Sequence, residues 1–294
     1  MRRIPVVVIA LILLIGVPAV SAAPAQAPEK THPFSIHDML AMDRISDSQV
    51  SPDGKTIVFN VRQTDLEGNR GRTDIWLVGV DGQGLRRLTN HPAAEFNGRW
   101  SACGKWIFFL STRSGASQVW RIRIDGGEAE QVTRLPLDVG NLVVGKGTLA
   151  VTMEVFPGMT PEETAAKLEA IEKDKATGRL YEKIFVRHWD TWSDGRRSHV
   201  FTLPAHGGEA KDLMPAMDAD TPSKPFGGPE EIAFTPDGKG LVFTAKDVGR
   251  EEAWSTDFDL YFVPADGSAA PRCLTEANQA WDTAPAFSPD GKTL

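Results

Sequence analysis

The sequence predicts an all-β protein, a β-propeller with an incomplete ring of blades and a helical insertion in the third blade. Two observations support this fold. One turn phrase recurs along the chain, and a second strand–turn phrase follows it at a nearly constant distance. Tandem units of about 40 to 50 residues with four short strands each are typical of propeller blades. A sandwich would not repeat its turn sequences in this way.

The first phrase is an apolar residue followed by Ser or Thr, then Pro-Asp-Gly-Lys, and then an apolar strand. Proline fixes the φ angle of the first central position of a turn, aspartate tolerates the second, and glycine leads the chain into the next strand. Each copy therefore predicts a hairpin corner. Complete copies begin at Ser51, Thr235 and Ser288, and a degraded copy with Ala-Cys in place of Pro-Asp begins at Ser101.

The second phrase is an alternating strand, a tight glycine turn and a short strand. From Gly54 to Gly82 is 28 residues and from Gly238 to Gly267 is 29, so the unit keeps its length. We therefore predict WD40-like or TolB-like blades of four-stranded antiparallel sheets. The predicted organisation is a lead-in segment at 24–44, blades at 45–90, 95–135, 138–215 and 228–277, and the start of a next blade at 283–294.

The first 23 residues have the pattern of an export signal. Arg2 and Arg3 precede an uncharged apolar run over 4–17, Pro18 interrupts it, and small residues follow near Ala22. The alternative is an uncleaved anchor, because 4–23 is just long enough to span a membrane. The proline and the small residues favour cleavage, so we expect a periplasmic or secreted protein without a stable membrane anchor.

The charge of the chain argues against a nucleic-acid partner. The sequence has 32 Lys and Arg against 39 Asp and Glu, and loss of Arg2 and Arg3 with the signal would leave 30 − 39 = −9. A nucleic-acid binder needs a basic stripe. The only local excess, Arg196-Arg197, is short and stands in a turn-like stretch.

Motifs that would indicate a catalytic or cofactor site within this chain are absent. The sequence contains no G-x-S-x-G, HExxH, P-loop or EF-hand pattern, and its six histidines lack metal-ligand spacing. A G-x-G-x-x-A match at 145–150 is followed by a strand instead of the helix that a dinucleotide site needs. Cys103 and Cys273 occupy different positions in their units, which favours unpaired thiols over a disulfide. We expect no cofactor, no metal and no catalytic residue here.

The third unit is much longer than the others and contains the predicted helix. From Gly147 to Gly207 is 60 residues, and we assign 156–195 to the insertion. Thr160-Pro161-Glu162-Glu163 predicts a capping box with Thr160 as N-cap. Such a local exception to a repeat is often functional.

The rest of the helix pattern predicts how it packs and ends. An apolar stripe of Ala165, Leu168 and Ile171 would face the protein. Glu163/Lys167 and Glu169/Lys173 would form i,i+4 pairs, and Gly178 would be the C-cap.

The insertion also carries a resemblance. Two runs of the insertion carry it: Lys175-Ala176-Thr177-Gly178-Arg179 and, further on, Phe185-Val186-Arg187-His188-Trp189-Asp190-Thr191-Trp192. Together with the repeats and the export signal, they resemble the secreted prolyl oligopeptidase family of serine peptidases, in its dipeptidyl-peptidase branch. Members carry further blades and an α/β-hydrolase domain with a Ser-Asp-His triad, which does not occur in this sequence. The resemblance implies an N-terminal part that gates access for oligopeptides, meets its substrate through the missing hydrolase domain and is inactive alone. It says nothing about oligomeric state.

Release of dipeptides from free N-termini implies carboxylates that hold the substrate ammonium. The candidate substrate-binding residues are Glu162, Glu163, Trp189, Asp190, Trp192 and Asp194. Helix capping and the helix dipole alone would account for the two glutamates. Packing between blades competes with substrate contact for the two tryptophans, whereas Trp76 and Trp120, at matching positions of consecutive blades, are expected in the core.

Two alternatives stay open. The chain could be a non-enzymatic TolB-like propeller that binds a partner in the cell envelope, or a short propeller enzyme, such as a lactonase, with a site on the central channel. The insertion argues against both, and the lack of clustered metal-ligand carboxylates argues against the second.

Overall fold

The computed structural model describes residues 32–294, so the predicted export signal lies outside the described residues. The described residues divide between two units, with the boundary after Met39. A short helix, α1 (Ile36–Ala41), begins in the first unit, where the Asp38 carboxylate accepts a hydrogen bond from the Ser35 N–H at 2.6 Å.

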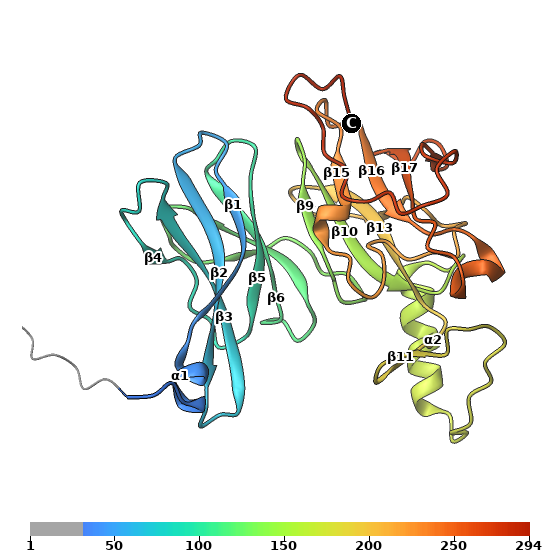
Figure 1. Ribbon diagram of the computed structural model, residues 1–294, viewed down its shortest axis with the longest axis horizontal. Coiled ribbons are helices and arrows are strands. Elements are labelled where there is room, and N and C mark those ends of the chain that lie inside the picture. Colours follow the sequence, from blue (N-terminus) through green and yellow to red (C-terminus); the bar gives the residue numbers. More distant parts are fainter. Residues whose placement is uncertain (1–31) are drawn as a thin grey trace, which may run out of the picture. The chain divides into compact units, whose positions relative to one another are not determined.

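The second unit is built from four four-stranded antiparallel sheets, and in each the spatial order of the strands follows their order in the sequence (Figure 1). The first sheet contains β1 (Arg44–Val50), β2 (Thr56–Asp65), β3 (Arg70–Gly79) and β4 (Arg86–Arg87). The second contains β5 (Glu95–Trp100), β6 (Trp106–Ser111), β7 (Gln118–Arg123) and β8 (Glu130–Gln131).

The third sheet contains β9 (Leu142–Val144), β10 (Thr148–Val155), β13 (Arg197–Pro204) and β14 (Lys211–Asp212). The fourth contains β15 (Ile232–Phe234), β16 (Gly240–Ala245), β17 (Asp259–Pro264) and β18 (Arg272–Cys273), with the 3₁₀ turns η1 (Pro229–Glu231) and η2 (Gly249–Ala253). Between β10 and β13 lie the helix α2 (Pro161–Lys173) and the small hairpin of β11 (Arg187–His188) and β12 (Thr191–Trp192). The predicted all-β fold of four-stranded blades with a helical insertion in the third is confirmed.

The recurring turn phrase closes each corner in the same way. In the first sheet the Ser51 N–H donates to Thr56 O at 2.7 Å, the Ser51 hydroxyl donates to the Asp53 carboxylate at 2.6 Å, and Gly54 has a φ of 71°. The hydrogen bond from Ser51 holds the pKa of Asp53 below its usual value. In the degraded copy Cys103 takes the place of the aspartate, and its exposed thiol lies 3.4 Å from the hydroxyl oxygen of Ser101.

Polar side chains four residues before the turn phrase join neighbouring sheets. Asp47, at a bulge in β1, accepts two hydrogen bonds from Arg99 of the second sheet, at 2.8 and 2.9 Å. Asn97, at the matching bulge in β5, accepts the Leu142 N–H of the third sheet at 3.1 Å. Both residues have a positive φ, 52° and 59°, so the backbone is bent where each side chain reaches the next sheet.

The core lies between consecutive sheets. One buried cluster joins the first and second sheets, another the second and third, and a third cluster joins the third and fourth. Within residues 32–294 no cluster joins the first sheet to the fourth, in agreement with an incomplete ring. Trp76 pairs with Phe59 as Trp120 pairs with Phe109, so the two tryptophans occupy matching positions, and Trp120 packs against the first of these clusters.

Candidate functional site

The insertion of the third sheet begins with the predicted capping box. The Thr160 hydroxyl accepts the Glu163 N–H at 3.2 Å, and the Glu163 carboxylate accepts the Thr160 N–H at 2.8 Å. The helix ends earlier than predicted, because Asp174, and not Gly178, is the C-cap. Asp174 is extended and its carboxylate accepts the Ala176 N–H at 2.9 Å, a local bond that competes with a further helical turn.

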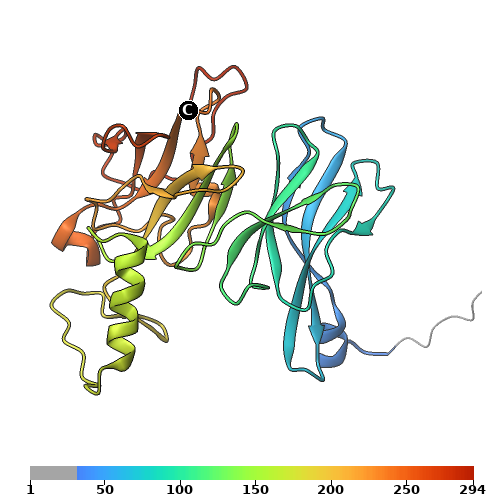
Figure 2. The ribbon, with the colours of Figure 1, turned by 180° about the vertical axis from the view of Figure 1, so that it is seen from behind.

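Only the first half of α2 packs against the sheet. Thr164 is fully buried and its hydroxyl accepts the Phe156 N–H at 3.3 Å, while Ala165 and Leu168 pack against the cluster between the second and third sheets. Ile171, the third member of the predicted stripe, is half exposed. Farther along, α2 runs away from β10 (Figure 2), and residues 169–173 at the end of the helix are exposed.

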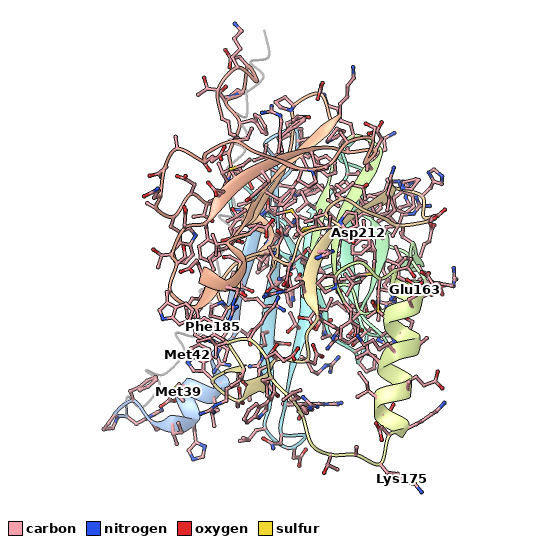
Figure 3. The ribbon with its side chains drawn as sticks, turned by 90° about the vertical axis from the view of Figure 1, so that its right-hand side faces the viewer. Met39, Met42, Glu163, Lys175, Phe185 and Asp212 are labelled. Carbon is pink, nitrogen blue, oxygen red and sulfur yellow. The ribbon has the colours of Figure 1, made fainter. Side chains whose placement is uncertain are left out.

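Of the two predicted i,i+4 pairs in α2, only Glu169–Lys173 forms. The Glu163 carboxylate is occupied by the cap, and the Lys167 ammonium lies over the Phe156 ring, 3.7 Å from its centroid. A cation–π contact against a largely buried ring has thus replaced the predicted surface ion pair. Figure 3 shows Glu163 at one end of α2 and Lys175 just beyond the other.

The four predicted carboxylates differ in whether neighbouring groups already form hydrogen bonds or ion pairs with them. Glu163 belongs to the capping box, and Asp194 binds the Arg196 guanidinium at 2.8 Å through Nε and at 2.7 Å through Nη2. Glu162 and Asp190 are exposed, and among residues 32–294 they have no ion pair or side-chain hydrogen bond.

The predicted tryptophans are exposed instead of packed between sheets. Trp189 is 70% exposed and Trp192 is 54% exposed. Trp189 lies at the tip of the β11–β12 hairpin with a φ of 45°, and its ring contacts those of His188 and Phe226, at centroid distances of 4.6 and 5.8 Å. Neither ring is packed between the sheets of residues 32–294. Phe226, from the connection between the third and fourth sheets, was not a sequence candidate.

The insertion returns to the third sheet at Arg197, which binds three carboxylates. Its guanidinium donates to Asp218 at 2.8 Å and to Asp220 at 2.9 Å, and it makes a two-pronged contact with Glu252 at 2.8 and 2.6 Å. Glu252 belongs to η2 of the fourth sheet. Planar, two-pronged contacts of this kind are among the strongest charge-assisted hydrogen bonds.

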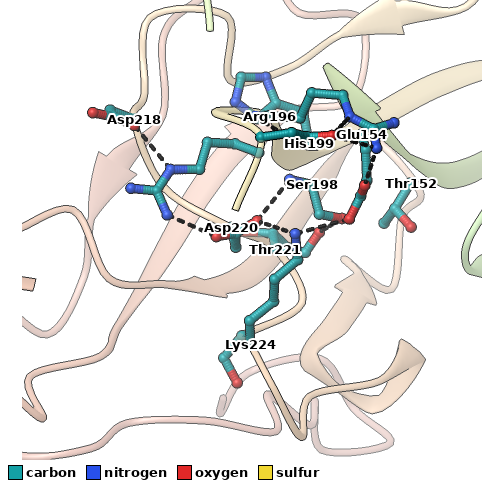
Figure 4. A network of polar contacts seen from close by, with 12 residues as sticks. Thr152, Glu154, Arg196, Ser198, His199, Asp218, Asp220, Thr221 and Lys224 are labelled. Atoms are coloured by element: carbon teal, nitrogen blue, oxygen red, sulfur yellow. Dashed lines mark hydrogen bonds and ion pairs between the residues drawn. The ribbon is translucent and has the colours of Figure 1, made fainter. Parts of the chain in front are cut away.

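Arg196 and Lys224 extend these contacts in the other direction (Figure 4). Arg196 reaches Glu154 of β10 at 3.3 Å, and Lys224 binds Glu154 at 2.8 Å and Asp220 at 2.9 Å. We call the set the anchor network; its members are Glu154, Lys183, Asp194, Arg196, Arg197, Asp218, Asp220, Lys224 and Glu252. The network links β10 and β13, the two strands between which the insertion lies, to the connection 213–228 and to the fourth sheet.

The pKa values within the anchor network reflect this pairing. Burial by itself would lower the pKa of Arg197, but the hydrogen bonds that Arg197 donates to Glu252 and Asp218, together with the charge of Asp220, raise it overall. Burial would raise the pKa of Asp218, yet hydrogen bonds from Lys183 and Arg197 lower it. Arg197 and Asp218 are thus held in their charged forms by their partners.

Sequence reasoning passed over this network. Arg196-Arg197 was noted only as a short basic excess, and the structure places Arg197 at the first position of β13. A usable signal was present: Asp220 follows Ser198 by 22 residues much as Asp138 follows Ser117 by 21, and both serine N–H groups donate to these aspartates.

Three further observations bear on the nature of the site. Across residues 32–294 no group of three or more His, Cys, Asp or Glu side chains is arranged to hold a metal ion. In the same residues, no helix has the length and apolar character needed to cross a bilayer. Cys103 and Cys273 are both free thiols.

Comparison with known proteins first defines the class of protein. Residues 44–142 match the model of the TolB β-propeller domain. Two acylaminoacyl peptidase structures share the fold. One, in complex with Z-Gly-Gly-Phe-chloromethyl ketone, has a TM-score of 0.55 at 12% identity and covers 80% of this chain and 33% of its own. That of Pyrococcus horikoshii has a TM-score of 0.54 at 14% identity, covering 80% and 32%. The chain is a TolB-type β-propeller whose third blade carries an insertion.

Sequence relatives show which peptidases the chain resembles. Dipeptidyl-peptidase 5 of Porphyromonas endodontalis is 32% identical over 277 residues, 92% of this chain and 39% of the relative. That of Porphyromonas gingivalis is 30% identical, covering 87% and 37%, and that of Aspergillus fumigatus is 26% identical, covering 94% and 40%. These similarities support the propeller part of a peptidase of the prolyl oligopeptidase family. The chain spans about two fifths of the length of these relatives.

Proposed function

We propose that this chain is the propeller part of an exported serine dipeptidyl-peptidase, and that it controls the access of oligopeptides to an active centre outside these residues. The observation that carries the proposal is the 32% identity to a dipeptidyl-peptidase 5 over 92% of the chain. The resemblance of the insertion sequence to the family and the absence of any G-x-S-x-G motif in these 294 residues support a division of labour between propeller and hydrolase. The export pattern at the N-terminus supports a periplasmic or secreted location.

Within the insertion, Glu162 and Asp190 are the carboxylates that we propose to hold the substrate ammonium. Both are exposed, whereas Glu163 and Asp194 already serve the capping box and Arg196. The exposed rings of Trp189 and Trp192 would supply apolar contact to the substrate. An ammonium placed between carboxylates and aromatic rings gains both ionic and cation–π stabilisation.

The test uses the full-length protein and chromogenic dipeptidyl substrates. We expect release of dipeptides from substrates with a free N-terminus, little turnover of N-acetylated ones, and none by residues 1–294 alone. Turnover by residues 1–294 would contradict the division of labour.

Two substitutions test the ammonium site. Glu162→Gln and Asp190→Asn should each raise KM for free-amine substrates about tenfold, a loss of about 1.4 kcal/mol, with kcat little changed. Glu169→Gln, on the same helix and also exposed, is the matched control. Unchanged KM values in both variants would remove these residues from the site while leaving the peptidase function intact.

The match to the TolB domain favours a second candidate, a propeller that binds a protein partner in the cell envelope. It predicts a full-length protein that releases no dipeptides and co-purifies stoichiometrically with one envelope protein. Dipeptide release would exclude it as the main function.

A further inference from the structure

The third sheet differs from the other three in the contact between its third and fourth strands. In those sheets a threonine hydroxyl, just after the fourth strand, accepts a backbone N–H of the third strand at 2.9 to 3.0 Å. The pairs are Ile75 with Thr89, Val119 with Thr133, and Leu260 with Thr275. In the third sheet the corresponding residue is Met214, which has no hydroxyl.

A buried histidine–aspartate pair takes over this connection. The side chain of His199 in β13 is 0% exposed, and its Nδ1 lies 2.9 Å from the Asp212 carboxylate of β14. Its Nε2 lies 3.1 Å from the carbonyl oxygen of Met217. The other oxygen of Asp212 accepts the Met214 N–H at 2.8 Å. Figure 4 places His199 beside the anchor network.

Both ring nitrogens of His199 therefore face hydrogen-bond acceptors. A neutral imidazole has one N–H and one lone pair, so it can satisfy only one of them. Satisfying both requires one more proton in the pair, and this proton resides on the ring because a carboxylic acid is a stronger acid than an imidazolium. Without that proton, a lone pair would face an acceptor in a site closed to water, which is costly.

The second sheet makes the same bridge without a titratable group. Gln118, at the position of His199, donates through Nε2 to Leu135 O and Leu137 O at 3.2 and 3.1 Å. Its Oε1 accepts the Thr133 hydroxyl at 2.8 Å. The fold therefore tolerates a neutral side chain at this position. At the two matching positions the first sheet has Asp74 and Arg87, joined as an ion pair, and the fourth has Asp259 and Cys273, so what distinguishes the third sheet among the four is that its pair is a histidine and an aspartate.

We propose that His199 and Asp212 form a proton-dependent clip that holds the connection 213–221 and, through it, the anchor network of the insertion. Met217 O binds the ring directly, and Asp218 and Asp220 of the same connection bind Arg197. Loss of the proton removes the Met217 contact or sets a lone pair against Asp212. Either change loosens the segment that holds Arg197, independently of the proposed peptidase function.

The charged groups around the clip are already paired with one another. From β14, Asp212 faces the ring; from β10, Glu154 stands next to Met153, the partner of His199, and is bound by Arg196 and Lys224. From the connection, Asp218 and Asp220 are bound by Arg197. No second cation among these groups faces the ring to replace its proton.

The direction of the pH effect follows from proton counting. An unfolded histidine is neutral above about pH 6.5, whereas satisfying both acceptors that face the His199 ring in the folded chain takes one more proton. Above that pH the folded chain binds more protons than the unfolded chain, so the stability due to the clip is full below about pH 6.5 and falls as pH rises. One proton corresponds to a change of up to tenfold in the unfolding equilibrium constant per pH unit.

The first experiment compares urea unfolding of the chain and of its His199→Gln/Met214→Thr variant between pH 6 and 8.5. The variant copies the neutral arrangement of the second sheet. We expect the unfolding constant of the unmodified chain to rise relative to the variant, by up to tenfold per pH unit. In parallel, hydrogen exchange of residues 213–221 should accelerate with pH beyond the intrinsic rate in the unmodified chain only. Identical pH dependence of the two proteins would overturn the proposal.

The Asp212→Asn variant provides a second test in case the double variant does not fold. An asparagine amide can donate to a neutral Nδ1, so this variant keeps the bridge without the extra proton and should lose the pH dependence. Nitrogen NMR of the histidine rings gives a direct check in the unmodified chain, with the signal of His199 identified from the variant. A doubly protonated ring at pH 7.5 supports the clip, and a neutral ring contradicts it.

Discussion

The second and third sheets solve the same packing problem with different chemistry. In both, the connection that leaves the fourth strand is fastened to the start of the third strand by a serine and an aspartate. The Ser117 N–H donates to Asp138 at 2.6 Å, and the Ser198 N–H donates to Asp220 at 2.8 Å. Both serine hydroxyls donate to a carbonyl of the connection at 2.8 Å. The repeat therefore preserves this fastening even where one sheet carries a long insertion.

The difference lies in the residues on either side of the serine. The second sheet has Ala116 and Gln118, both uncharged, where the third has Arg197 and His199. These replacements convert a neutral fastening into a charged one that also reaches the fourth sheet through Glu252. The comparison teaches that added charge holds the return of the insertion to the third sheet, while the first half of α2 packs against the existing apolar cluster.

The largest expected effect comes from removing the central charge of the anchor network. Arg197→Ala, which copies Ala116 of the second sheet, leaves three carboxylates without their shared partner and should lower the free energy of unfolding by about 2–3 kcal/mol. Urea unfolding measures the loss. Arg197→Lys keeps the charge but not the planar fork and should recover part of the stability. If Arg197→Ala lowers the free energy of unfolding by less than about 0.5 kcal/mol, the charged fastening of the third sheet is not stronger than the neutral fastening of the second.

A smaller contrast is expected between the two aspartates of the shared fastening. Asp138→Ala removes a hydrogen bond to one N–H and should cost about 1 kcal/mol. Asp220→Ala also removes contacts to Arg197 and Lys224 and should cost about 2 kcal/mol. The two variants are each other's control in thermal or urea unfolding. Equal costs would show that the added charges contribute no net stability.

Acid should weaken the third sheet through its lowered carboxylate pKa values. Burial would raise the pKa of Asp218, but its bonds to Lys183 and Arg197 depress it below 3.8. A depressed folded pKa contributes stability that is present above the unfolded value and is lost as pH falls through the folded value. The stability difference between the unmodified chain and Asp218→Asn should therefore be present at pH 5 and shrink from about pH 4 downward. A difference independent of pH would exclude ion pairing as its cause.

The smallest effect is expected at the exposed pair of α2. Lys173→Ala removes the contact to Glu169, and since both side chains are mostly exposed it should change the free energy of unfolding by about 0.3 kcal/mol. Urea unfolding in low and high salt checks this. A loss comparable to that of Arg197→Ala would contradict the view that burial and multiple partners give the anchor network its strength.

Local patterns were predicted well because their causes are local. The turn phrase sets its own φ angles and hydrogen bonds within six residues, and the capping box of Thr160 and Glu163 closes within four. The end of α2 and the Glu163/Lys167 pair were predicted wrongly. In each case a competing partner, the Asp174 side chain or the Phe156 ring, offered a better contact than the expected one.

The candidate site was only half visible in the sequence. Chemistry and resemblance pointed to the carboxylates and tryptophans of the insertion. Whether a carboxylate is available depends on its neighbours, as the engagement of Asp194 by Arg196 shows. Phe226 and Glu252 come from segments 30 or more residues beyond the insertion, and no spacing rule connects them to it.

The sequence by itself determined the blade repeat, the corners and the position of the insertion, because periodicity and turn chemistry act over a few neighbouring residues. The tertiary structure decided which charges meet. Arg197 finds Asp218, Asp220 and Glu252, and His199 finds Asp212 and Met217, because two sheets and their connection bring these groups within hydrogen-bond distance. Ion pairs and buried protons depend on distance and burial, and both are properties of the folded chain.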